Sequence, residues 1–174
     1  MSHTHGASLA EGIEMSSVLF KRFLPGFDES NRTRQAPGLP NHLAWTLGHL
    51  AMVLNRIAEK LDKQPMPASD FVEGGKGDAN RFAIDAVSFK SEPKDAPAEY
   101  PSLARCLEIF DAAIARSAAA CRKADDATLA STTPWGPSTI TLAGAAQRMV
   151  FHNGTHCGQI VDLRRALGMK RVLE

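Results

Sequence analysis

One stretch of the sequence carries a regular seam of aliphatic residues, and this seam limits the folds that the chain can adopt. Its members follow one another at steps of four, three, four, three and four residues: Leu43, Leu47, Leu50, Leu54, Ile57 and Leu61. Such steps bring side chains to one face of an α-helix, whereas a strand requires steps of two. We therefore predict a helix over about Asn41–Leu61 that packs through this face, with Asn41, after Pro40, as its N-cap.

Three other segments show the same spacing of apolar residues. They predict helices over about Ser8–Leu24, Ser102–Ala124 and Thr141–Leu167. Ser102 and Thr141 are of the type that caps helix N-termini, and Gly168 stands where a glycine ends a helix. Because runs of β-branched residues are scarce, the chain is expected to consist of four amphipathic helices.

The stretch between the second and third helices, residues 62–101, is rich in proline and glycine. Within it, only Arg81–Lys90 is expected to hold a short strand or helical turn. Loops of this length inside a compact domain are usually crossover or functional segments. We therefore predict an all-α protein, a four-helix bundle with a long crossover loop between helices 2 and 3 and short links elsewhere. A chain of 174 residues suits one domain over residues 1–174.

Charge and composition argue against several kinds of partner. Lys plus Arg is 20 and Asp plus Glu is 19, which leaves a net charge of +1 and no basic stripe. Nucleic acid and membrane surfaces are therefore not expected as partners, and no apolar run approaches the roughly 20 residues of a membrane span.

Cys106 and Cys121 would lie about 22 Å apart on one helix, too far for a disulfide. Since the N-terminus lacks the pattern of a secretory signal, we expect a cytoplasmic protein.

Two histidines lie four residues apart in the stretch FHNGTHCGQI, within the predicted fourth helix. His152 and His156 fall on the core-facing stripe of that helix, one turn apart, where two imidazoles can share one cation. The alternative is a pair of hydrogen-bonded core histidines, which would need a partner for each buried nitrogen. The pair alone does not decide between these two interpretations.

A third histidine favours the metal. His49 lies in the middle of the second helix, at a level that the fourth helix can face, whereas His42 is near the helix start and suits a cap or a solvent-exposed role. His3 and His5 are expected in an exposed, mobile N-terminal segment with at most weak affinity for metal. Three histidine ligands are typical of an open metal site, whose fourth position takes water or substrate. We predict such a site from His49 and the pair on the fourth helix.

Several familiar catalytic motifs are absent. Asn153 follows His152, so the zinc-protease motif His-Glu-x-x-His is not formed. The Glu-x-x-His motif of di-iron bundles fails at both His49 and His156. There is no Cys-x-x-Cys pair, no glycine-rich phosphate loop and no nucleophile–base pair at a telling spacing. No catalytic residue is therefore assigned from the sequence.

Two blocks of the sequence resemble the DinB-like family (DinB/YfiT), a group of small bacterial four-helix-bundle metalloproteins. The first block is NHLAWTLGHL, residues 41–50, with a Trp and then a Gly-His pair. The second is HNGTHCGQI, residues 152–160, with His-x-x-x-His and Gly-Gln-Ile, followed by an Arg-containing helix end. The helix layout resembles the family over nearly the whole chain.

The resemblance implies roles for several residues. His49, His152 and His156 would be the three metal ligands, and the metal would be a divalent transition ion, nickel or zinc, between which imidazole ligands do not choose. Gly48 and Gly158 would allow close approach of helices near the site. Gln159 would orient a ligand or a bound water, or else make a hydrogen bond inside the bundle.

Other residues near these blocks have two interpretations each. Cys157 is a redox-sensitive thiol near the metal or, more simply, a small buried apolar residue. Arg56 and Arg148 either bind the carboxylate of a substrate or make surface salt bridges. Trp45 walls the site or packs in the core, and Trp135 is expected to cover the bundle end, with ligand contact as the alternative.

Three functions follow from the resemblance and the site. The leading hypothesis is a metal-dependent thiol transferase in which the metal activates a thiol or water, with a small-molecule substrate and a low-molecular-weight thiol as second cofactor. The first alternative is a non-catalytic, stress-linked metal-binding protein with a structural metal. The second is a metal-assisted hydrolase. The resemblance also allows a homodimer.

Overall fold

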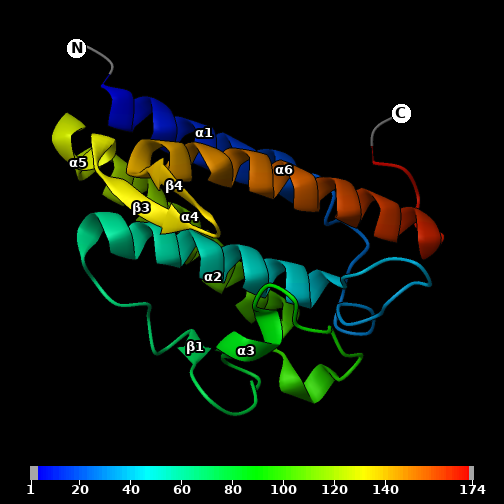
Figure 1. Cartoon of the computed structure of the whole chain (residues 1–174). Coiled ribbons are helices and arrows are strands. Elements are labelled where there is room, and N and C mark those ends of the chain that lie inside the picture. Colours follow the sequence, from blue (N-terminus) through cyan, green and yellow to red (C-terminus); the bar gives the residue numbers. More distant parts are fainter. Residues whose placement is uncertain (1–3, 173–174) are drawn as a thin grey trace.

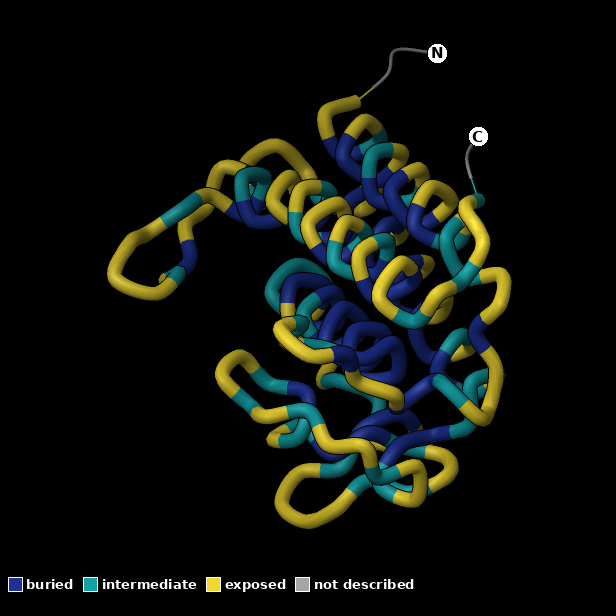
Figure 2. Tube along the Cα trace, turned by 90° about the vertical axis from the view of Figure 1, so that its right-hand side faces the viewer, coloured by how far each residue is buried: buried dark blue, intermediate teal, exposed yellow. Residues whose placement is uncertain are grey.

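The computed structural model describes residues 4–172, and the chain is mostly helical, as expected for the all-α class (Figure 1). Four long helices dominate: α1 (His5–Lys21), α2 (Leu43–Asp62), α4 (Leu103–Lys123) and α6 (Leu142–Ala166). Helix α4 packs against α1 and α2, and α6 packs against the same two helices from the other side. Figure 2 shows that the sides of these helices that face one another are buried.

The aliphatic seam of the second predicted helix is the inner face of α2. Leu43, Leu47, Leu50 and Leu54 are fully buried, while Leu61 at the far end is only partly so. Burial of one such side chain contributes about 1.5–3 kcal/mol. The seam therefore places α2 at the centre of the core, between α4 and α6.

The ends of the helices test the predicted caps. Ser102 and Thr141 accept hydrogen bonds from the backbone N–H groups three residues on, so both predicted N-caps are confirmed. The predicted Asn41 cap is wrong: His42 caps α2, because its Nδ1 accepts from the Trp45 N–H at 3.1 Å. Helix α6 ends as predicted, since Gly168 follows it with φ +70°.

The first helix begins three residues before the predicted start. Thr4 caps α1 through its hydroxyl, so His5 opens a regular helix rather than lying in a mobile segment, although its side chain is exposed as expected. His3 lies outside the described residues. The helix ends at Lys21, and the chain continues through turns at Pro25.

The segment between α2 and α4 contains more regular structure than a loop. Strands β1 (Phe71–Val72) and β2 (Phe82–Ala83) pair in parallel, and α3 (Ile84–Val87) follows directly. A 3₁₀ turn, η1 (Pro97–Glu99), precedes α4. Strand β2 and helix α3 fall within the predicted stretch Arg81–Lys90, whereas β1 and η1 lie outside it; α3 packs against α2.

At Gly48, the element that packs closely against α2 is strand β2 of the segment between α2 and α4, and not another helix. A Cβ at Gly48 would lie 2.7 Å from ring carbons of Phe82, so only glycine lets this ring reach α2. At Gly158 nothing lies within 4 Å of the corresponding position. The close helix approach expected at both glycines is therefore wrong: Gly48 makes room for β2, and Gly158 faces open space.

The link between α4 and α6 was expected to be short, and it is not. It contains α5 (Asp126–Ala130) and an antiparallel hairpin of β3 (Thr132–Trp135) and β4 (Ser138–Thr141). The signal for the hairpin is its β-branched threonines on both sides of Gly136, which turns with φ +56°. Figures 1 and 2 show the hairpin beside α6, standing out from the long helices.

The long helices run in defined directions. Asn41 contacts Gln159 and His49 contacts His152, so α2 and α6 are antiparallel. Asn153 donates to Ser16, and α1 runs parallel to α6 (Figure 1). None of the helices in residues 4–172 combines the length and the apolar character that crossing a bilayer requires.

Candidate metal centre

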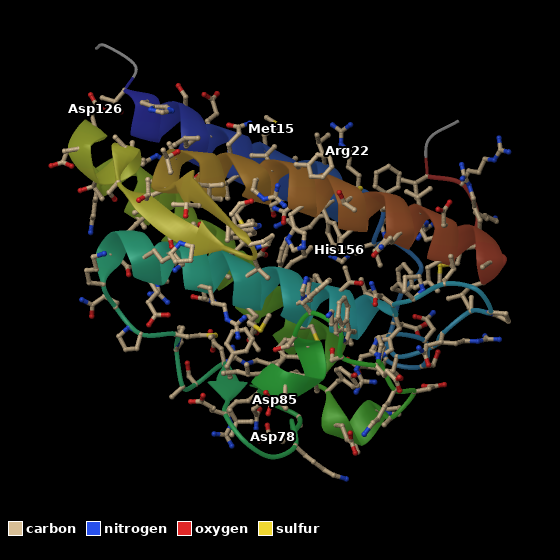
Figure 3. All side chains as sticks on the ribbon, in the orientation of Figure 1. Met15, Arg22, Asp78, Asp85, Asp126 and His156 are labelled. Atoms are coloured by element: carbon tan, nitrogen blue, oxygen red, sulfur yellow. The ribbon has the colours of Figure 1, made fainter. Side chains whose placement is uncertain are left out.

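Three histidines from two helices meet in the core between α2 and α6. One ring nitrogen from each of His49, His152 and His156 lies within 4.8 Å of the others. The Nε2 atom of His152 is 3.3 Å from Nε2 of His49 and 3.2 Å from Nε2 of His156. Figure 3 shows His156 in the space between the α6 and α2 ribbons.

The segment between α2 and α4 (residues 63–102, the crossover segment) fixes the orientation of the His49 ring. Its Nδ1 is 2.7 Å from the carbonyl oxygen of Val87, the last residue of α3, so Nδ1 carries the proton and donates it. Nε2 is then left with a free lone pair that points to the cluster. The ring also stacks on Trp45, with centroids 4.6 Å apart and planes 10° apart.

Trp45 is in turn held by the same segment. Its Nε1–H donates to Ser91 Oγ at 2.8 Å, and the Ser91 hydroxyl donates to the carbonyl of Ala86. Trp45 therefore walls one side of the His49 ring and packs in the core, which combines its two predicted roles. Residues around α3 fix both rings.

The two histidines of α6 are less completely satisfied. The Nδ1 atoms of His152 and His156 are buried and have no partner at full hydrogen-bond distance among residues 4–172, although the Gln159 side chain interacts with His156 and raises its pKa. Because His49 carries its proton on Nδ1, the Nε2 atom of a neutral His152 can make a hydrogen bond with only one of the two Nε2 atoms that it contacts. An arrangement of this kind costs free energy unless a cation occupies the space between the nitrogens.

The spacing of the nitrogens suits such a cation. With metal–nitrogen bonds of about 2.0–2.1 Å and tetrahedral angles, neighbouring ligand nitrogens lie about 3.3–3.4 Å apart. The two Nε2–Nε2 distances, 3.3 and 3.2 Å, come close to this value. The residues present therefore fit a divalent transition ion.

Burial keeps the three imidazoles neutral. It lowers the pKa of His49, with the Arg56 charge acting in the same direction. Burial, followed by the charges of His49 and Arg148, lowers the pKa of His152 to about 4. Burial and the two neighbouring histidines lower the pKa of His156 to about 3. Neutral imidazole is the form that binds a metal.

Two arginines flank the cluster. Arg56 and Arg148 are exposed, and the surface salt bridges expected for them do not form with any carboxylate in the described part of the chain. The Arg148 guanidinium lies over the Trp135 ring, 5.2 Å from its centroid. Trp135 thus contacts α6 beside the histidines rather than covering the bundle end.

Other predicted residues have structural roles. Gln159 accepts a hydrogen bond from Asn41 at 3.0 Å, which is the bundle-internal alternative. Cys157 is half-buried and packs on the core, and burial raises the pKa of its thiol, so the thiolate is disfavoured. His42 is fully buried as a cap rather than exposed to solvent.

The contribution of Val87 was missed by sequence reasoning. Its role depends on a backbone carbonyl, which every residue type supplies, so no sequence signal could have identified it. Ser91 was missed because it lies 46 residues after Trp45 in an irregular stretch. Both become visible only when the crossover segment is placed against α2.

Fold and site together define a mostly helical protein with a three-histidine cluster suited to a metal. The family model of the DinB superfamily matches residues 14–160, and the chain belongs to this superfamily. A comparison with curated proteins returned no significant match. Among solved structures, the chain is similar to a conserved protein from Enterococcus faecalis. The two share 16% sequence identity at a TM-score of 0.70, over 92% of this chain and 95% of that one, which supports the fold alone.

Proposed function

We propose that the protein binds one divalent transition-metal ion, nickel or zinc, through the Nε2 atoms of His49, His152 and His156, and uses it for thiol transfer. The observation that carries this proposal is the convergence of the Nε2 atoms of three histidines whose burial disfavours the charged form. Membership of the DinB superfamily supports it. We further propose that residues 1–174 form a single domain.

The protein supplies three ligands and leaves room for a fourth from outside. Among residues 4–172, no further Cys, Asp, Glu or His joins the cluster. His49 and His156 are buried, whereas His152 is only half-buried, so the cluster reaches the surface on the His152 side. An open coordination position on the accessible side favours a catalytic role over a purely structural one.

The surroundings favour a thiol over water as the nucleophile. When bound, the ion would lower the pKa of a thiol or water that it holds and so supply a nucleophile at neutral pH. A hydrolase also needs a general base within reach of the attacking water. Among residues 4–172, no Asp or Glu joins the histidine cluster, and the Arg56 and Arg148 charges that lower the pKa of His49 and His152 are positive.

The chain's own residues then have defined tasks. Val87 and Trp45 hold the His49 ring in place, so that its Nε2 faces the cluster with little loss of side-chain freedom. The apolar core around α2 excludes water from the inner side of the site. The cationic surface near His152 favours an anionic nucleophile over a neutral one.

One observation supports a second candidate, a non-catalytic protein with a structural metal. The ligands come from two helices, so an ion would cross-link α2 to α6 in a largely buried position. Two cavities of about 440 and 350 Å³ lie elsewhere, beside Tyr100 and Arg164. A structural ion would stabilise the fold without using the accessible side of the cluster.

Metal analysis of untagged protein, purified without added metal, tests these candidates. We expect about one ion per chain, which His49→Ala and His152→Ala lose while circular dichroism stays helical. His5→Ala, which removes an exposed histidine from α1, is the matched control and should keep the ion. Loss of helix together with metal would favour the structural candidate, and wild-type protein that takes up neither zinc nor nickel would refute the site.

Activity is then measured on the metal-loaded protein. A suitable reaction joins 3-mercaptopropionate to 1-chloro-2,4-dinitrobenzene: the sulfur–carbon bond forms, chloride leaves and the thiol proton goes to solvent. We expect metal-loaded wild-type protein to react faster than the uncatalysed reaction does, and we expect His152→Ala to abolish this increase in rate. A stoichiometric ion with no turnover for any thiol–electrophile pair would support the structural candidate.

A further inference from the structure

Arg56 and Arg148 lie on the same side of the histidine cluster. Helices α2 and α6 are antiparallel, so moving toward the end of α2 corresponds to moving toward the start of α6. Arg56 follows His49 by seven residues and Arg148 precedes His152 by four, steps that keep each arginine on the helix face of its histidine. The helical rise places their Cα atoms about 10 and 6 Å along the axes from those histidines.

Neither guanidinium has an anionic partner within residues 4–172. Arg105 and Arg116, by contrast, each bind a carboxylate, at 2.6 and 3.0 Å. An exposed arginine without an anionic partner is not unusual in itself, and Arg22, directly after the end of α1, is another case in the described chain (Figure 3). The specific feature is that two such arginines, from different helices, flank one cluster.

The hairpin supports one of the two side chains. The ring of Trp135 lies under the Arg148 guanidinium at 5.2 Å, a cation–π contact that limits the freedom of the arginine. Stacking uses the face of the planar guanidinium and leaves its N–H edge available for an acceptor. Arg148 is therefore partly positioned for a ligand before one binds.

The charged side chains beside the cluster are positive. Within residues 4–172, the Arg56 charge lowers the pKa of His49 and the Arg148 charge lowers the pKa of His152. In Figure 3, Asp85 lies on the other side of the α2 ribbon from His156. A divalent ion held by three neutral imidazoles would add two further positive charges.

We propose that Arg56 and Arg148 form a carboxylate clamp, by which we mean two guanidinium groups that bind one carboxylate at this end of the cluster. The clamp rests on the proposed metal site, because the ligand it selects is a small acid whose other end reaches the metal position. The substrate class is then a short thiol with a carboxylate a few bonds from the sulfur. Guanidinium and carboxylate match as planar, bidentate partners.

The test compares three thiols in which the same number of bonds separates the thiol sulfur from the terminal oxygen atoms. The probes are 3-mercaptopropionate, 2-mercaptoethane-1-sulfonate and 3-mercapto-1-propanol, titrated calorimetrically into zinc-loaded protein whose metal content is measured alongside. The variants are Arg56→Gln and Arg148→Gln. Arg165→Gln is the matched control, since Arg165 is an exposed arginine on α6 that pairs with Asp162.

We expect wild-type protein to bind the carboxylate at least tenfold more tightly than the alcohol. Each clamp variant should weaken carboxylate binding about five- to tenfold and leave alcohol binding within about twofold, and the control should change neither. Trp135→Leu should reduce the preference for the acid by a smaller factor at unchanged metal content, which identifies Trp135 as a positioning residue for Arg148.

Failure of the clamp can be told apart from failure of the metal site. Equal affinity for acid and alcohol in wild-type protein, or a preference that survives both arginine variants, would overturn the clamp while a full metal complement upheld the site. Arginine-dependent binding of the sulfonate but not of the carboxylate would overturn the assignment to carboxylates. Wild-type protein without metal would overturn both proposals.

Discussion

Two buried histidines, the N-cap of α2 and a residue two turns into that helix, have opposite hydrogen-bonding surroundings. At the start, His42 uses both ring nitrogens: Nδ1 accepts from the Trp45 N–H, and Nε2–H donates to the Lys94 carbonyl at 3.0 Å. Seven residues on, His49 donates from Nδ1 to Val87 and points Nε2 at two other histidines.

Burial and a lowered pKa do not distinguish the two positions. Burial lowers the pKa of His42 to about 4, in the same direction as for the cluster histidines. What differs is whether every nitrogen has a partner. A buried histidine with two partners stabilises the fold, whereas the cluster brings three Nε2 atoms together and leaves two buried Nδ1 atoms without a partner among residues 4–172, an arrangement that suits metal binding.

The largest expected difference between the His42 position and the histidine cluster is in the stability that added zinc provides. Zinc at a thousandfold excess over its dissociation constant would add about 4 kcal/mol to the free energy of unfolding of wild-type protein. His152→Ala should lose this gain completely, and His42→Asn should keep it, because His42 is not in the cluster. Thermal melts with and without zinc measure both; a zinc gain that survives in His152→Ala would break the comparison.

The pH dependence of stability should report on His42. Its pKa is about 4 in the folded protein and about 6.5 when unfolded, so the unfolded state binds more protons between these values. The contribution of neutral His42 is therefore fully present above about pH 6.5 and is lost as the pH falls toward 4. The shift corresponds to about 3 kcal/mol.

Metal-free protein unfolded by urea at pH 7.0 and at pH 4.5 measures this effect. His42→Asn retains a capping side chain and should lose less stability over this range than wild-type protein does. The carboxylates and other histidines titrate in both proteins and cancel in the difference. Equal losses in the two proteins would show that His42 does not keep its neutral form in the fold.

The contact between Trp45 and Ser91 should show how strongly the crossover segment supports the cluster. Ser91→Ala leaves the buried indole N–H of Trp45 without its 2.8 Å acceptor, at a cost of about 1–2 kcal/mol in unfolding free energy. Because Trp45 stacks on His49, zinc affinity should fall by up to about tenfold, measured by competition with a chelator. Ser69→Ala, elsewhere in the same segment, is the control and should leave zinc affinity unchanged.

The two glycines beside the histidines should respond differently to the same substitution. Gly48→Ala places a methyl group 2.7 Å from the Phe82 ring and should cost about 1–3 kcal/mol. Gly158→Ala meets open space in the middle of α6 and should be neutral or stabilise by up to about 1 kcal/mol. Urea midpoints measure both, and equal costs would contradict the different surroundings of the two positions.

Much of the helical framework could be predicted because it depends on local spacing. The steps of three and four residues identified α2, and the hydroxyl caps at Ser102 and Thr141 follow from side-chain chemistry within one turn. The Asn41 cap failed because α2 begins at Leu43, which makes His42 the capping residue, and the Nδ1 of His42 accepts from the Trp45 N–H. The β3–β4 hairpin was missed because its β-branched strands are short and lie between two long segments with helical spacing, so their own pattern is weak.

The sequence by itself determined which faces of α2 and α6 carry His49, His152 and His156, since a helix converts spacing into direction. Only the tertiary structure decided that these faces meet with Nε2 atoms 3.2 and 3.3 Å apart, because the register between two helices depends on all the side chains packed between them. It also decided that the Val87 carbonyl fixes the His49 tautomer and that Trp135 lies under Arg148. Both contacts join residues from different elements. The first uses the Val87 backbone carbonyl, a group that every residue type supplies, so the sequence contains no signal for it.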